Sequence, residues 1–165
     1  MKKRILSLFS VVVLCVVMAG AVVNAETSDS EQKIVDGSYL TTEESSTGYS
    51  HPPMAKGEYL MTGVSTISKA GLTRVYAYAS TTANQTVDYM ATLVHVERYN
   101  EETDGWGYVY AWAEEAENDY YMSTADSVKV DRGYYYRVRT RHIAGDYDDY
   151  PYDETASFTD GILLP

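Results

Sequence analysis

Apolar and polar residues alternate along the chain from Gly57 onward, in short segments separated by turn residues. A period of two is typical of β-strands, because successive side chains point to opposite faces of a sheet. The clearest turn signal is Asp104-Gly105, which predicts a hairpin between two of these segments. We expect strands over residues 59–68, 72–80, 86–99, 106–113, 120–123, 127–130, 133–143 and 155–164.

The spacing of these segments predicts the fold class. They recur at intervals of about 8–12 residues, and no window shows a convincing helical period. We therefore expect an all-β domain over residues 57–165, and more closely an antiparallel β-sandwich of about seven or eight strands, of immunoglobulin or fibronectin type. Seventeen tyrosines against two phenylalanines and two tryptophans fit this class, since aromatic side chains pack well across pleated strands.

Residues 26–56 differ in composition from the predicted domain. They are rich in serine and threonine, contain few large apolar side chains and show no sustained period. Such a segment does not bury enough apolar surface to fold alone, so we expect a flexible N-terminal tail. Val35 and Leu40 are among the few apolar residues that suit a short docked strand. His51-Pro52-Pro53 then marks the boundary, because proline cannot donate to a β-ladder.

The first 25 residues predict a signal peptide. Basic residues 2–4 precede an uncharged stretch at residues 5–23, and Val23-Asn24-Ala25 supplies the small residues of a cleavage site before Glu26. The uncharged stretch is nearly long enough to span a bilayer, so a retained membrane anchor is the alternative. We expect cleavage and a secreted, extracellular protein.

Charge and cysteine content exclude several classes of function. The chain has 24 acidic and 13 basic residues, a net charge of −11, whereas nucleic-acid binding needs concentrated Lys and Arg. Three of the basic residues lie at positions 2–4, so the mature chain would keep 10 of them and carry a net charge of −14. The single cysteine, Cys15, leaves with the signal peptide, and bulky Leu14 before it disfavours a lipoprotein. The mature chain therefore has no disulfide and no cysteine nucleophile.

One predicted strand carries four aromatic residues at alternate positions: Trp106, Tyr108, Tyr110 and Trp112. On a regular strand all four rings share one face. An exposed row of this kind would stack on successive sugar rings, which makes these four residues the candidate ligand-binding residues. The alternative is that the row faces the core, since a long exposed aromatic row is costly without a ligand.

The segment that starts at Gly133 predicts a structural strand. Tyr134, Tyr136 and Val138 share one face of it, and Tyr135, Arg137, Arg139 and Arg141 share the other. Its tyrosine run is typical of the strand that bears a tyrosine corner, in which the hydroxyl bonds to the backbone upstream. The three arginines would form an anion site or pair with acidic residues on neighbouring strands, and we favour pairing.

The remaining candidates for catalysis or metal binding lack a recognised spacing. Acidic residues gather at positions 146–154, but their offsets match no EF-hand calcium loop. His51, His95 and His142 form no zinc motif, and the chain has neither a G-x-S-x-G motif nor a glycine-rich phosphate loop. Two carboxylates of a glycoside hydrolase remain an alternative, because folding can bring any two acids together. We expect no catalytic residue, no metal and no cofactor.

Several motifs in order along the chain resemble those of a known family. They are residues 63–71, Val87-Asp88 with Glu97-Arg98, Trp106 after its Asp-Gly turn, residues 133–138 with His142, and residues 154–162. Residues 57–164 resemble a family of small, uncharacterised secreted proteins of Gram-positive, largely anaerobic bacteria. The resemblance implies a secreted location. It implies no activity, and it carries no known catalytic or binding residue.

These observations predict a secreted, non-catalytic β-domain that acts by surface contacts at the cell envelope or in the extracellular space. We expect its partner to be a protein or a glycan at the cell surface. We expect no nucleic acid, no membrane contact once the signal is removed, and a monomer. A carbohydrate-binding module that uses the aromatic strand is the first alternative. A secreted hydrolase with two carboxylates is the second.

Overall fold

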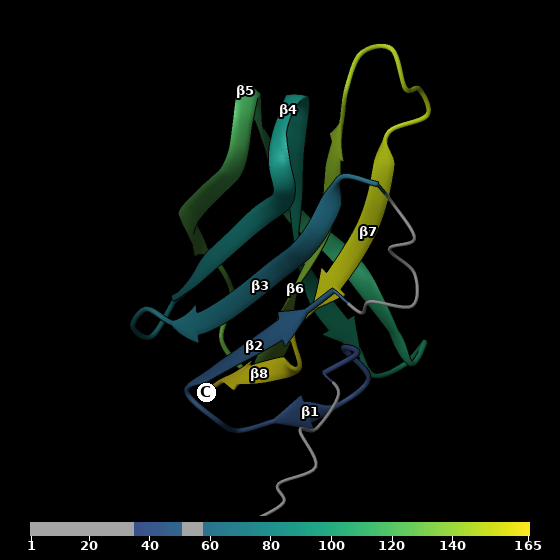
Figure 1. Ribbon diagram of the computed structural model, residues 1–165. Helices are drawn as coiled ribbons and strands as arrows, with labels where there is room; N and C mark the ends of the chain where they lie inside the picture. The colour runs from purple at the N-terminus through teal and green to yellow at the C-terminus, as the bar shows by residue number, and fades with distance from the viewer. Residues whose placement is uncertain (1–34, 51–57) are drawn as a thin grey trace, which may run out of the picture. The chain divides into compact units, whose positions relative to one another are not determined.

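The computed structural model describes residues 35–50 and 58–165, and this part of the chain contains strands and no helix. The predicted all-β class is therefore confirmed. Residues 1–25 and the prolines at 52 and 53 lie outside the described residues. The strands are β1 (Leu40–Thr41), β2 (Ser45–Tyr49), β3 (Leu60–Lys69), β4 (Arg74–Asn100), β5 (Gly105–Lys129), β6 (Tyr134–Gly145), β7 (Asp153–Phe158) and β8 (Gly161–Leu164) (Figure 1).

All eight strands belong to one hydrogen-bonded sheet. Its order is β1-β8-β6-β4-β3-β2, with β5 paired to β4 and β7 paired to β6. Neighbours are antiparallel except for β1 and β8, which run parallel. The structure is thus a single curled, mixed sheet and not the purely antiparallel arrangement that the sequence predicted.

Strands β4 and β5 are each longer than predicted. The segments expected as separate strands at 72–80 and 86–99 are joined in β4, and those between 106 and 130 are joined in β5. The polar residues between Thr82 and Val87, which resembled a loop, form an irregular stretch where the ladder with β5 shifts register. There β4 changes its second neighbour from β3 to β6. Asn118 adopts a φ of +54° at the facing part of β5.

The core lies between the two halves of the curled sheet. Ile67 of β3 and the first half of β4 belong to the same buried cluster as the second half of β4, β6 and β8. In Figure 1, β3 accordingly crosses in front of β6. Trp112 Nε1 donates to Thr124 Oγ1 at 2.9 Å, so β5 also folds back toward itself. The cluster comprises Ile67, Val75, Ala77, Ala79, Val94, Val96, Val128, Val130, Tyr136, Val138, Ile162 and Leu164.

The predicted tail contributes two strands to the sheet, which corrects the domain boundary at residue 57. Strand β2 pairs with β3, and Leu40, which the sequence left open as part of a short docked strand, lies in β1. Serine and threonine join this edge readily because their hydroxyls find partners, as in the 2.9 Å contact between Thr47 and Thr66. Gly48 is also required, since a Cβ there would overlap the carbonyl oxygen of Phe158.

The predicted hairpin at Asp104-Gly105 is confirmed, whereas the closing strand predicted at 155–164 is divided into β7 and β8. Asn100 pairs with Gly105, and the turn between them ends at Asp104 with a φ of +47°. Among the described residues, no helix is long and apolar enough to cross a membrane.

Candidate functional site

The four aromatic residues of the predicted platform do not form one row. Residues that pair across an antiparallel ladder point to the same face of the sheet. Tyr110 and Trp112 therefore share a face with two buried valines of β4, whereas Tyr108 shares the other face with Glu97. A register shift between Val96 and Glu97 makes Val109 an extra residue and moves the rings to opposite faces. The paired residues are Val94 with Trp112, Val96 with Tyr110, Glu97 with Tyr108 and Tyr99 with Trp106.

Each of these rings has different surroundings. Trp112 packs against the core cluster and bonds to Thr124, and Tyr110 lies beside it with ring centroids 5.8 Å apart. Trp106 lies under the guanidinium of Arg137, whose Cζ is 4.2 Å from the ring centroid. Tyr108, at 70% exposure, is the most accessible of the four. Their proposed role in ligand binding therefore has no common surface to support it.

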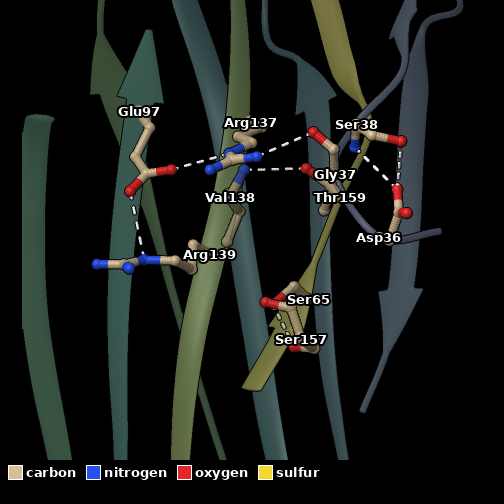
Figure 2. A network of polar contacts seen from close by, with 10 residues as sticks. All are labelled: Asp36, Gly37, Ser38, Ser65, Glu97, Arg137, Val138, Arg139, Ser157 and Thr159. Carbon is tan, nitrogen blue, oxygen red and sulfur yellow. Dashed lines mark hydrogen bonds and ion pairs between the residues drawn. The ribbon is translucent and has the colours of Figure 1, made fainter. Parts of the chain in front are cut away.

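Arg137 of β6 connects β4 and the segment before β1 through a partly buried contact network (Figure 2). Its Nε donates to Glu97 Oε2 at 2.8 Å, and one terminal nitrogen donates to the Gly37 carbonyl at 2.9 Å. The other carboxylate oxygen of Glu97 lies 3.3 Å from Arg139 Nε. Burial lowers the pKa of Arg137, and Glu97 partly offsets this. Because Arg141 also forms a two-point ion pair with Glu154 at 2.7 Å, the predicted pairing of the three arginines is confirmed.

Tyr136 occupies the position expected of a tyrosine corner. Its ring is almost completely buried, and its hydroxyl donates to the carbonyl oxygen of Asp131, five residues upstream, at 2.8 Å. Burial raises the pKa of this hydroxyl. The bond holds the turn before β6 against the core, so the residue has a structural role.

The acidic loop after β6 uses its carboxylates to bind backbone. Asp153 Oδ2 accepts hydrogen bonds from the backbone nitrogens of Tyr59 at 2.7 Å and Leu60 at 3.1 Å. Asp146 accepts from the backbone of Asp88, whose own carboxylate accepts from the backbone of Tyr147. No group of three or more potential metal-binding side chains gathers within the described part of the chain. The acidic residues thus fasten this loop to β3 and β4.

A serine and a histidine in contact suggest catalysis but lie inside the core. His142 Nε2 is 2.7 Å from Ser157 Oγ, and its Nδ1 is 2.8 Å from Thr81 Oγ1. Ser157 continues the network to Ser65 at 2.6 Å. All of these side chains are completely buried, and burial lowers the pKa of His142 to about 4. The network satisfies polar groups within the core, as buried hydroxyls require.

The outer surface of β2, β3 and the halves of β4 and β5 that pair with them forms what we call the hydroxyl face. Cross-strand pairing places the side chains of this face together, while the intervening residues, such as Val75 and Ala77, are buried. It comprises Ser45, Thr47, Tyr49, Thr62, Val64, Thr66, Ser68, Tyr76, Tyr78, Ser80, Thr82, Tyr121, Ser123, Ala125 and Ser127. None of these residues carries a formal charge at neutral pH, and the face ends at the charged pair of Arg74 and Lys129.

Tyrosine rings give the hydroxyl face its accessible apolar area. Tyr49, Tyr76 and Tyr121 are 51%, 41% and 43% exposed. The hydroxyls of Tyr78 and Tyr121 lie 3.0 Å apart, so the rings are tied to one another across the strands. The sequence did not reveal this face because its residues come from four segments, one of them in the predicted tail.

An open pocket of about 580 Å³ lies between the β4–β5 hairpin and the turn before β6. Arg98 of β4 enters it with its Cζ 4.6 Å from the ring centroid of Tyr134. Arg132 lies on the opposite segment and donates from Nε to the backbone oxygen of Pro165 at 2.6 Å. Pairing of β4 with β6 brings these two arginines together across the sheet. Sequence reasoning missed the pocket because nothing in their spacing links them.

Comparison of the chain with protein-family models, with curated proteins and with solved structures finds no match. No activity, ligand or residue role therefore transfers to it from a relative. The functional conclusion rests on the surfaces that the chain itself presents.

Proposed function

We propose that this chain is an exported, non-catalytic domain that binds an uncharged partner through the hydroxyl face. The observation that carries the proposal is that the fifteen residues of this face carry no formal charge, in a chain with 24 acidic and 13 basic residues. The nearest charges on the same surface are Arg74 and Lys129, which pair at its end. Tyrosine and serine supply rigid ring area and adaptable hydrogen bonds, and binding surfaces of antibodies are enriched in the same residues. The face is thus suited to binding, and its chemistry selects a neutral ligand.

A neutral polysaccharide of the cell envelope or extracellular space is the partner that fits this face best. Such a polymer presents flat sugar rings and many hydroxyls, and it has no charge. Tyr49, Tyr76 and Tyr121 offer rings for stacking, and the serines and threonines between them donate and accept hydrogen bonds. This proposal keeps the carbohydrate-binding alternative but moves it from the aromatic strand to the hydroxyl face. A protein partner is the competing outcome of the test.

Export is supported by the sequence at residues 1–25, where a basic cluster, an uncharged stretch and a small-residue cleavage site follow one another. We also propose that the chain is related to the small secreted proteins of Gram-positive bacteria that it resembles. The mature N-terminus would be Glu26. Intact mass of the exported protein tests this, and a lipid on Cys15 or retention of residues 1–25 would contradict it.

The finer fold assignment, a sandwich of immunoglobulin or fibronectin type, also belongs to this proposal. It is supported by the corner bond from Tyr136 to Asp131 and by the core shared between the two halves of β4. The parallel β1–β8 pair is a departure from that type. An experimental structure with two separate sheets over residues 58–165 would support the assignment, and an open half-barrel would contradict it.

The binding proposal is tested by retention on an insoluble neutral polysaccharide such as cellulose or a mixed-linkage glucan. The double variant Tyr76→Ser/Tyr121→Ser should lose retention by about tenfold, as expected when central aromatic contacts are removed. Retention of the unaltered protein should change little between about 50 mM and about 500 mM salt, because no ion pair is involved.

The matched control is Tyr120→Ser, which removes an exposed tyrosine from the same strand at a position next to Tyr121. Tyr120 has no cross-strand partner on β4 and does not belong to the hydroxyl face, so this variant should bind as the unaltered protein does. Equal retention of the double variant and the unaltered protein would contradict the proposal. So would binding that is lost as salt rises.

A further inference from the structure

The pocket between the β4–β5 hairpin and the turn before β6 has features of a binding site that the hydroxyl face lacks. None of its lining residues belongs to that face. Its volume of about 580 Å³ lies within the range of about 300–1,000 Å³ common for small-molecule sites. Two arginines line it in a chain that is strongly acidic overall. They are Arg98 and Arg132.

Both guanidinium groups are positioned by the protein while keeping capacity for a ligand. Arg98 is held over the ring of Tyr134, and its contact with Asp131 at 3.5 Å is the longest ion pair among residues 35–50 and 58–165. Arg132 is anchored through Nε to Pro165, and its two terminal nitrogens make no hydrogen bond within the described residues. By contrast, Arg137 and Arg141 are held by carboxylates at 2.7–2.8 Å.

Two acidic residues at the pocket indicate how much negative charge a ligand can carry. Glu101 and Glu102 lie on its rim, so the pocket as a whole is not strongly positive. A dianion such as a phosphate monoester would be repelled by these carboxylates more strongly than a single carboxylate placed between the arginines. Guanidinium groups bind carboxylates with two parallel hydrogen bonds.

The uncharged residues of the pocket indicate the shape of the ligand. The ring of Tyr134 is 44% exposed and Tyr135 lines the same pocket, so a flat ring has a surface on which to stack. Asn100 and the glutamates provide acceptors for hydroxyl groups. We infer that this pocket binds a carboxylate-bearing sugar, such as a uronic acid unit of an extracellular polysaccharide. The carboxylate would contact the two arginines, and the sugar ring would pack against Tyr135 and the part of Tyr134 that Arg98 leaves exposed.

This site is independent of the hydroxyl face, so the two proposals fail separately. The probes are a pair of disaccharides that differ in one group. One is glucuronic acid linked β-1,4 to glucose, and the other is cellobiose, in which a hydroxymethyl group replaces the carboxylate. Calorimetry on the full mature chain should show at least about tenfold tighter binding of the acidic disaccharide, equivalent to one good charged contact. That preference should weaken as salt rises, unlike binding at the hydroxyl face.

Two variants identify the residues responsible. Arg132→Gln and Arg98→Gln should each weaken binding of the acidic disaccharide by about tenfold or more and leave that of cellobiose unchanged. Arg141→Gln removes the same charge from an exposed ion pair outside the pocket, and it should bind as the unaltered protein does. Arg132 also holds Pro165, so its substitution could weaken binding by loosening the C-terminal segment. Arg98→Gln does not touch that contact, and a loss of binding in both variants therefore points to the pocket. Equal affinity for the two disaccharides, binding of neither, or an equal loss in Arg141→Gln would overturn the inference.

Discussion

Gly63 of β3 lies directly against the imidazole ring of His142 on β6. A Cβ at position 63 would stand 2.2 Å from Cδ2 of that ring, which is far inside contact distance. The close approach lets β3 cross β6 while His142 bonds to Thr81 and Ser157 on either side. The packing of the two halves of the sheet therefore depends on a residue with no side chain.

Gly63→Ala should destabilise the domain by about 1–3 kcal/mol, the usual cost of overpacking a core, or by more if the histidine loses its hydrogen bonds. Urea unfolding measures the change. Gly107→Ala is the control, because a Cβ there would have its nearest neighbour at 3.8 Å. A stability equal to that of the unaltered protein in Gly63→Ala would contradict the described packing.

His142 should make the domain less stable in mild acid. Its pKa is about 4 in the folded state because burial disfavours the charged form, whereas the ordinary value is 6.5. As pH falls from about 6.5 toward 4, His142 becomes protonated in the unfolded chain but stays neutral in the folded chain. Stability is therefore complete above about pH 6.5, and up to about 3 kcal/mol is lost by pH 4.

The imidazole NMR signals of His142 test this directly, since they should not titrate above about pH 5. Unfolding of His142→Gln at pH 7 and pH 5 gives a second measure, because the variant should lack this part of the pH dependence. Titration of the ring near pH 6.5 in the folded protein would show that it is not buried as described.

Arg137→Met should destabilise the domain by about 3 kcal/mol. It would leave the nearly buried Glu97 carboxylate with Arg139 as its one remaining ion-pair partner among the described residues, and it would remove the hydrogen bond from Arg137 to the Gly37 carbonyl. Arg141→Met is the matched control. Its pair with Glu154 is exposed, so its loss should cost less than about 1 kcal/mol. Similar melting curves for the two variants would rule out a special role of Arg137.

Tyr136→Phe removes the hydroxyl of the tyrosine corner and keeps the ring. We expect a loss of about 1 kcal/mol, the usual value for one hydrogen bond, because the Asp131 carbonyl loses this donor. Tyr134→Phe alters a half-exposed ring on the same strand and should be nearly neutral. Urea midpoints distinguish these outcomes, and an unchanged midpoint in Tyr136→Phe would argue against the corner.

The parts of the fold that follow from local pattern were predictable. Alternation located β3 and β6, the Asp104-Gly105 signal located the hairpin, and the arginines of β6 paired with acids as expected. The features that depend on distant partners were not. The bulge at Val109 reverses which rings share a face, yet it leaves no local mark in an alternating sequence.

The N-terminal strands and the candidate sites also depend on distant partners that the local sequence pattern does not reveal. Thr47 and Gly48 belong to a polar segment, and they become a strand because β3 and Phe158 provide partners. Arg98 and Arg132 meet because β4 pairs with β6. Hydrophobic pattern predicts which segments are strands, but it does not predict which side chains the curled sheet brings together.

The central claim is that the hydroxyl face binds a neutral polysaccharide, and chemical-shift mapping with a soluble neutral oligosaccharide such as cellohexaose tests it most directly. Binding should shift the backbone amide signals of β2, β3 and the parts of β4 and β5 that pair with them, most strongly around Tyr76 and Tyr121. It should leave the signals of Trp106 and Tyr108 unchanged. Shifts centred on Trp106 and Tyr108, or no shifts at millimolar oligosaccharide, would contradict the claim.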